Sequence, residues 1–89
     1  MNQKGLVRMT IDEALLEFDK SAIEKVFNKL ADDYECRIPD CFENPEYLIR
    51  VLKDLYGNSH TTIVDSIKKK LEKYASEKSI EKFLMGISN

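Results

Sequence analysis

The sequence is poor in the residues that punctuate loops and crosslink chains: it has three glycines, two prolines, two cysteines and no tryptophan. Three scattered glycines leave no glycine-rich loop of the kind that cradles phosphates. Two cysteines are too few for a disulfide scaffold, which fits a reducing compartment. No apolar run approaches the ~18 residues of a membrane span, and the N-terminus MNQKGLVRMT lacks the apolar stretch of a signal peptide. We therefore expect a cytoplasmic protein that does not enter a membrane.

The chain is also short of net charge. It carries 14 basic and 16 acidic residues in 89, a net charge of −2, so no global attraction draws it to nucleic acid. The charge is mildly uneven, with a net −4 over residues 1–57 and a net +2 over residues 58–89. A length of 89 residues is that of one domain, so we treat residues 1–89 as a single unit with a small core.

Helical periodicity organises the chain, because apolar residues recur three and four positions apart and no segment shows the alternation of a strand. Acids after Thr10 indicate a first helix, which leaves residues 1–9 as a flexible lead. Ser21 and Glu24 match a capping box before a second helix, whose apolar stripe holds Phe27. We predict an all-α fold, a compact bundle of four to five short helices.

The second half of the chain carries clearer boundaries. Asn44, Pro45 and Glu46 form a strong helix start, and Gly57 suits the end of that helix. Residues 58–62 are a polar hinge before a helix that begins near Ile63 and extends to residue 74. Residues 76–89 hold a closing helix that Gly86 terminates, although its separation from the preceding helix stays open.

Both cysteines lie in one loop, YECRIPDCFENPEYL, and raise the question of a metal or redox site. Cys36 and Cys41 supply only two of the four ligands of a structural zinc site, and His60 is the only histidine that could join them. A disulfide between the two thiols would close a very small loop and would need oxidising conditions. We favour a connecting loop without metal or cofactor, and keep a thiol- or metal-responsive site as an alternative.

A lysine-rich segment, residues 68–82, is the one basic feature. Lys68, Lys69, Lys70 and Lys73 are candidates for phosphate contacts, and a nucleic-acid-binding helix is therefore an alternative function. Interleaved glutamates favour a solvated, salt-bridged face instead, and the segment has no arginine for base recognition. We do not expect nucleic acid to be the main partner.

Nothing in the sequence marks an active site. No nucleophile lies in a recognisable constellation, and the adjacent acids Asp32 and Asp33 diverge by about 100° on a helix. Apolar and aromatic residues instead suggest binding surfaces. Leu15, Leu16 and Phe18 spread wider than one helical stripe requires, while Tyr47 and Tyr56 lie at helix ends, where they could seal the core or contact a partner.

The order of IDEALLEF, AIEKVFNKLADDYECRIPDCFENPEYLIRVLKDLYG and IVDSIKKKLEKY resembles the archaeal Nitrosopumilus output domain family. The resemblance covers residues 10–75, and the matching positions are Ile38, Pro39, Asn44, Pro45, Glu46, Leu52, Leu55 and Gly57. It implies a small helical module at the output end of archaeal signalling. The family motif carries no catalytic residues, so none transfers to this chain.

We therefore expect a non-enzymatic helical interaction or output module that acts through protein–protein contacts. Its partner is another protein or a second copy of the chain. The candidate contact residues are Leu15, Leu16, Phe18, Tyr47, Tyr56, Lys68, Lys69, Lys70 and Lys73.

Overall fold

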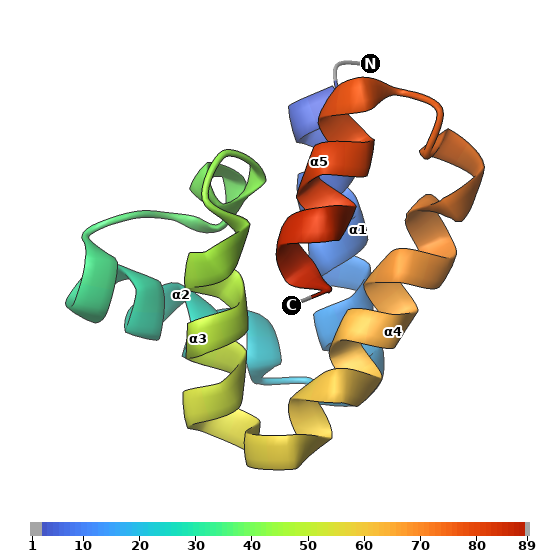
Figure 1. The fold of residues 1–89 in the computed structure, drawn as a ribbon. Coiled ribbons are helices and arrows are strands. Elements are labelled where there is room, and N and C mark those ends of the chain that lie inside the picture. Colours follow the sequence, from blue (N-terminus) through green and yellow to red (C-terminus); the bar gives the residue numbers. More distant parts are fainter. Residues whose placement is uncertain (1–2, 89) are drawn as a thin grey trace.

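The computed structural model describes residues 3–88, which form five α-helices and three short 3₁₀ helices and contain no strand (Figure 1). The elements are α1 (Gln3–Phe18), α2 (Ala22–Tyr34), η1 (Ile38–Phe42), α3 (Pro45–Tyr56), η2 (Gly57–Ser59), α4 (His60–Leu71), η3 (Glu72–Tyr74) and α5 (Lys78–Ile87). The prediction of an all-α bundle is confirmed.

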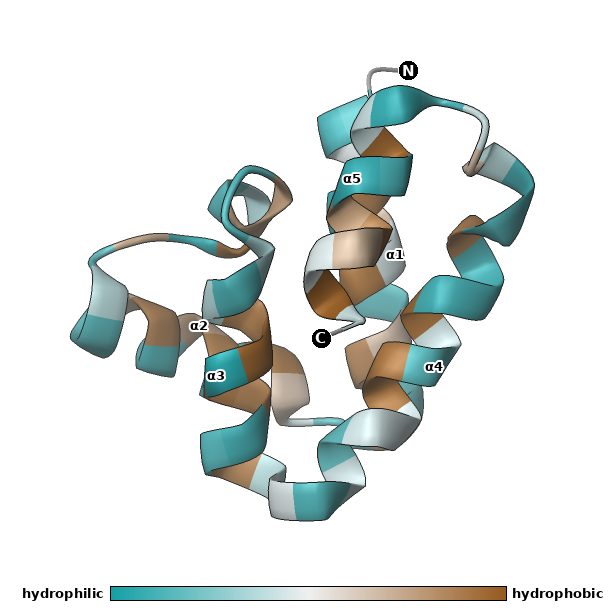
Figure 2. Cartoon of the chain, in the orientation of Figure 1, coloured by the Kyte–Doolittle hydropathy of each residue, from teal (hydrophilic) through white to brown (hydrophobic). Residues whose placement is uncertain are grey.

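The helices enclose one core in a body of 32 × 24 × 23 Å. Helix α1 lies behind α5, while α3 and α4 diverge on either side of α5 and are joined through η2 (Figure 1). Hydrophobic residues recur along all five α-helices (Figure 2), and buried residues from each of them form one core cluster. The largest fully buried side chains, Ile11, Leu15, Leu30, Leu48, Leu52, Ile63, Ile67, Leu71, Ile80 and Phe83, come from every α-helix.

Helix α1 begins well before the predicted start. The described residues 3–9 are helical, so the prediction of a flexible lead over residues 1–9 is wrong for them, while residues 1 and 2 lie outside the described chain. Val7 is buried one turn before Ile11 and extends the same apolar face. Thr10 does not cap the helix, because its hydroxyl donates to the Leu6 carbonyl within it, at 2.9 Å.

The helix boundaries near Ser21 and Asn44 are where the sequence placed them, but the cap interactions differ. The Ser21 hydroxyl donates to the Asp19 carboxylate at 3.1 Å, so the capping box with Glu24 does not form. Asn44 precedes α3 and Pro45 opens it, yet the Asn44 amide donates to the Asp40 carbonyl at 3.2 Å. These side chains therefore tie each helix to the preceding turn.

The predicted hinge at residues 58–62 is largely helical. Gly57 ends α3 with a φ of +58°, and η2 leads directly into α4 at His60, three residues before Ile63. The His60 Nδ1 atom lies 2.9 Å from the Gly57 carbonyl oxygen, and the Thr61 hydroxyl donates to the Asn58 carbonyl at 3.1 Å. These local hydrogen bonds satisfy carbonyl groups that a flexible hinge would leave to water.

Two further corrections concern the C-terminal region. Residues 68–82 are not one helix, because α4 ends at Leu71 and α5 starts only at Lys78. Gly86 does not terminate the closing helix, which continues to Ile87. Its role is a close approach, since a Cβ atom at Gly86 would lie 2.8 Å from the Pro45 Cβ and closer still to the Pro45 Cγ. Glycine thus lets α5 pack against the start of α3.

Candidate functional site

The cysteine loop is held by its own backbone and by the core. Pro39 lies in the first turn of η1, and the Asp40 carboxylate accepts a hydrogen bond of 2.9 Å from the Arg37 backbone N–H. This turn directs Ile38 and Cys41 into the core, where both are buried. The loop therefore covers one part of the core with the side chains of Ile38 and Cys41.

The thiols and His60 do not form a site. Cys36 and Cys41 are both free, and burial raises the pKa of Cys41 to about 12, so its thiol stays protonated. His60 starts α4, at the opposite end of α3 from the loop (Figure 1). Among residues 3–88, no three His, Cys, Asp or Glu side chains gather into a group that could hold a metal ion.

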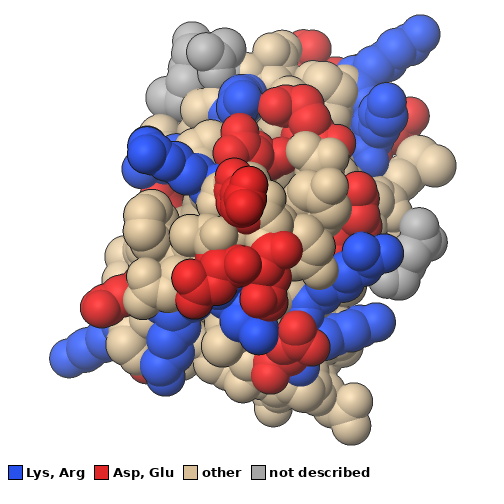
Figure 3. Space-filling model, turned by 90° about the vertical axis from the view of Figure 1, so that its left-hand side faces the viewer, with Lys and Arg blue, Asp and Glu red and all other residues tan. Residues whose placement is uncertain are grey.

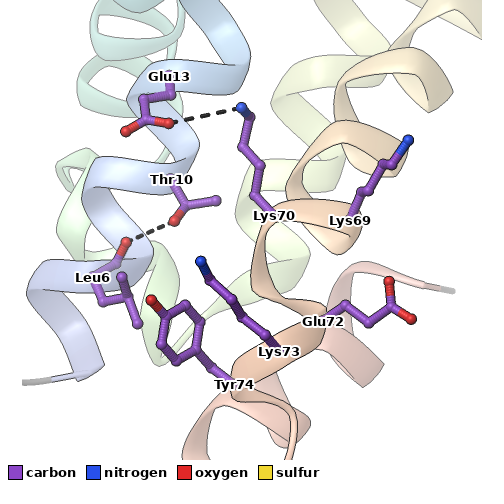
Figure 4. Close-up of a pocket in the computed structure, with 8 residues that line it drawn as sticks. All are labelled: Leu6, Thr10, Glu13, Lys69, Lys70, Glu72, Lys73 and Tyr74. Atoms are coloured by element: carbon purple, nitrogen blue, oxygen red, sulfur yellow. Dashed lines mark hydrogen bonds and ion pairs between the residues drawn. The ribbon is translucent and has the colours of Figure 1, made fainter.

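The lysines split between two surfaces. Lys68 lines a shallow groove with His60 and Lys53. Lys69, Lys70 and Lys73 line a separate hollow of about 630 Å³, which we term the lysine cleft. Its other lining residues are Leu6, Thr10 and Glu13 of α1, and Glu72 and Tyr74 of η3 (Figure 4). Lys68, Lys69 and Lys70 all lie on α4, so it is their direction around this helix that divides the basic run between the two hollows.

Ion pairs join the two walls of the lysine cleft. The Lys70 ammonium lies 2.8 Å from a Glu17 oxygen and 3.7 Å from a Glu13 oxygen, which links α4 to α1. The hydrogen bond from Lys70 lowers the pKa of Glu17, and the same bond raises the pKa of Lys70. Lys73 lies over the Tyr74 ring at 5.3 Å from its centroid. Lysine and tyrosine groups thus line a cleft that remains open to solvent.

The tyrosine candidates lie in aromatic pairs. Tyr47 stacks on Tyr34 with ring centroids 4.4 Å apart, which joins the end of α2 to the start of α3. Tyr56 meets Phe18 edge to face at 4.9 Å and joins α1 to the end of α3. All four rings are partly buried against the core. Their contacts within the chain account for their positions, and they seal helix ends.

Of the α1 candidates, only Leu16 is largely exposed. Leu15 is completely buried and belongs to the core, so it cannot contact a partner in the folded protein. Leu16 is 53% exposed, and Met9, two turns earlier on the same side of the helix, is 49% exposed. Met9 was not predicted as a contact residue, because residues 1–9 were expected to form a flexible lead.

Phe27 extends this surface onto α2. It is 46% exposed, so its placement in the buried stripe of the second helix is wrong. It lines a groove together with Asp12 and Arg8 of α1. Asp12 lies three residues after Met9 and four before Leu16, on the same side of α1. We term the surface formed by Met9, Leu16 and Phe27 the apolar face.

Acidic side chains dominate another side of the molecule. Figure 3 shows them through the middle of the side on which α2 and η1 lie, with basic side chains mostly toward its margins. Residues 19–46 contain eight acidic and four basic residues. This side is not suited to a nucleic-acid backbone, which needs clustered cations.

None of the described helices combines the length and apolar character needed to cross a bilayer. Comparison with family models, with curated proteins and with solved structures gives no match to this chain. The two candidate functional surfaces of this chain are therefore the apolar face and the lysine cleft, both of which α1 helps to form.

Proposed function

We propose that this protein is a non-enzymatic interaction module that self-associates through the apolar face. The observation that carries this proposal is the two-sided character of α1. One side places Val7, Ile11 and Leu15 in the core, and the opposite side exposes Met9 and Leu16. Met9 and Leu16 do not belong to the core of the bundle, so a contact with another molecule explains their apolar character best.

The apolar face would form the centre of a dimer contact, and the rest of α1 would surround it. Helix α1 has 16 residues and is therefore about 24 Å long, and Phe27 widens the surface onto α2. A standard interface buries about 800 Å² per partner, which is roughly one seventh of the 5525 Å² surface of this chain. In a C2 pair the same face meets itself, so each Met9 and Leu16 packs against apolar side chains of the other copy.

Charge supports a second copy as the occupant. The net charge of −2 gives little repulsion between two copies. The apolar face also holds both signs, since Arg8 and Asp12 line its groove. Charges of both signs beside the apolar face suit a contact with a second copy better than a contact with a strongly charged partner.

The setting of this activity is archaeal signalling or regulation, as the resemblance to the Nitrosopumilus output domain family implies. In that setting the module delivers an input received from another protein. A cytoplasmic location is supported by the free thiols of Cys36 and Cys41, which suit a reducing compartment.

Light scattering on a size-exclusion column tests self-association, with reducing agent present and at low and high salt. We expect a dimer whose mass does not change with salt, because apolar burial dominates the contact. Leu16→Glu places a charge in the middle of the apolar face, so we expect a monomer that keeps its helical circular-dichroism signal. Met85→Glu is the matched control, because Met85 is 64% exposed on α5, and this variant should remain dimeric.

A wild-type protein that stays monomeric at high micromolar concentration would contradict the proposal. So would a pattern in which Met85→Glu dissociates the dimer and Leu16→Glu does not. That second result would place the contact on α5.

A further inference from the structure

The lysine cleft has a concentration of donor groups that the dimer contact does not use. In Figure 4 the Lys70 and Lys73 side chains and the Tyr74 hydroxyl point into the space between α1 and α4, whereas Lys69 and Glu72 point away from it. The α1 wall opposite them holds Leu6, Thr10 and Glu13. The cleft thus joins two ammonium groups and a hydroxyl with the Glu13 carboxylate, and Glu17 adds a second carboxylate beside Lys70.

The balance of charge in the lysine cleft leaves one ammonium group available. Lys70 already pairs with Glu17 and Glu13. Lys73 forms no ion pair with any described residue, and its contact is with the ring of Tyr74, 5.3 Å from the centroid. The Lys73 ammonium and the Tyr74 hydroxyl can therefore donate to the same anionic group, and the partly neutralised Lys70 can add a third hydrogen bond.

Glu13 restricts the kind of anion that fits. It accepts hydrogen bonds only, so it repels a bare anion and favours a ligand that offers hydroxyl or amino donors on its other side. It lies on α1, across the cleft from Lys73 and Tyr74 (Figure 4). The volume of about 630 Å³ falls within the range of small-molecule sites.

We propose that the lysine cleft binds a small phosphate ester that also carries hydroxyl or amino donors, of the size of a nucleoside monophosphate. The phosphate contacts Lys73, Tyr74 and Lys70, and the donor groups of the ester contact Glu13. This inference does not depend on self-association, because none of the residues of the apolar face lines the lysine cleft.

Calorimetric titration of the full chain tests the site with adenosine monophosphate, inorganic phosphate and adenosine as probes. We expect adenosine monophosphate to bind more tightly than phosphate, and adenosine not to bind measurably. Lys73→Gln should weaken adenosine monophosphate binding about fivefold to tenfold, because one charged hydrogen bond to the phosphate is lost. Lys78→Gln, on an exposed lysine of α5, is the matched control and should change the affinity less than twofold.

Glu13→Gln tests whether Glu13 recognises the ester, as distinct from the attraction of any phosphate to the lysine side chains. It should tighten the binding of inorganic phosphate and so reduce the preference for the ester. No saturable heat with adenosine monophosphate would overturn the proposal, and so would equal losses in Lys73→Gln and Lys78→Gln. Sedimentation with phosphatidylserine vesicles distinguishes the source of the phosphate, and vesicle binding that requires Lys73 would overturn the assignment to a soluble ester.

Discussion

The fold disfavours the ionised form of the Asp12 carboxylate. Its Oδ1 atom is buried and has no hydrogen-bond partner among the described residues, while Oδ2 lies 3.7 Å from the Arg8 Nε. Burial raises the pKa of Asp12 above its ordinary value, and the nearby Arg8 charge lowers it by a smaller amount. A raised folded-state pKa means that the protonated form stabilises the fold, and this stabilisation is lost as pH rises through that pKa.

We therefore predict that Asp12→Asn raises the melting temperature at pH 7. The gain should be about 2 to 4 °C, because partly exposed sites shift stability by about 0.5 kcal/mol and a domain of this size moves roughly 4 to 8 °C per kcal/mol. The gain should vanish below the ordinary pKa of aspartate, where Asp12 is neutral in both folded and unfolded chains. Thermal melts at both pH values measure this, and a lower melting temperature for Asp12→Asn at pH 7 would show that the Arg8 contact outweighs burial.

The two thiols should differ in reactivity. The thiolate is the reactive form, and a pKa of about 12 leaves Cys41 almost fully protonated at pH 8. Cys36 is only partly buried, so we predict that iodoacetamide labels Cys36 in the native protein and leaves Cys41 intact. Mass spectrometry after a timed reaction measures this, with a denatured sample as the control in which both react. Equal labelling under native conditions would show that η1 opens readily.

At the scale of elements, the contact between α3 and α5 depends on the missing side chain of Gly86. A methyl group there would overlap the ring of Pro45. Overpacking lowers the free energy of unfolding by about 1 to 3 kcal/mol, whereas the higher helix propensity of alanine raises it by up to about 1 kcal/mol. We predict that Gly86→Ala lowers the free energy of unfolding by about 1 to 2 kcal/mol, as measured in urea.

Two variants show whether the loss arises from this contact. Pro45→Ala combined with Gly86→Ala should recover part of the stability, because the ring atom closest to the new methyl group, Cγ, is gone, although Cβ remains. Met85→Ala, on the exposed side of the same helix, should stay within about 0.5 kcal/mol of the wild type. A Gly86→Ala protein more stable than the wild type would mean that α5 shifts without penalty.

At the scale of the whole molecule, α1 separates the two proposed surfaces. None of Met9, Leu16 and Phe27 lines the lysine cleft, although Glu13 of the cleft lies one turn from both Met9 and Leu16 on α1. The proposed phosphate ligands Lys73 and Tyr74 belong to η3 instead, so substitutions at Leu16 and Lys73 should act independently. We predict that Leu16→Glu leaves the affinity for adenosine monophosphate within twofold, and that Lys73→Gln leaves the dimer intact. A loss of ligand affinity in the Leu16→Glu monomer would instead show that dimerisation shapes the cleft.

The sequence by itself determined the helical class and the boundaries of α2 and α3. Apolar spacing, Pro45 after Asn44, and a glycine at residue 57 are local signals, and local backbone physics decides them. The same kind of signal failed where two local interpretations compete. Thr10 resembles a cap when residues 1–9 are set aside, but Val7 continues the buried face and the helix extends to Gln3.

Only the tertiary structure decided which apolar and charged residues remain available. Leu15 and Leu16 are adjacent in the chain, yet packing buries the first and leaves the second exposed. Lys68 and Lys70 belong to one run, but the crossing of α4 with α1 directs them to different hollows. Exposure depends on which helices pack against each side, and that arrangement involves contacts between residues far apart in sequence. Periodicity within one helix therefore cannot predict it.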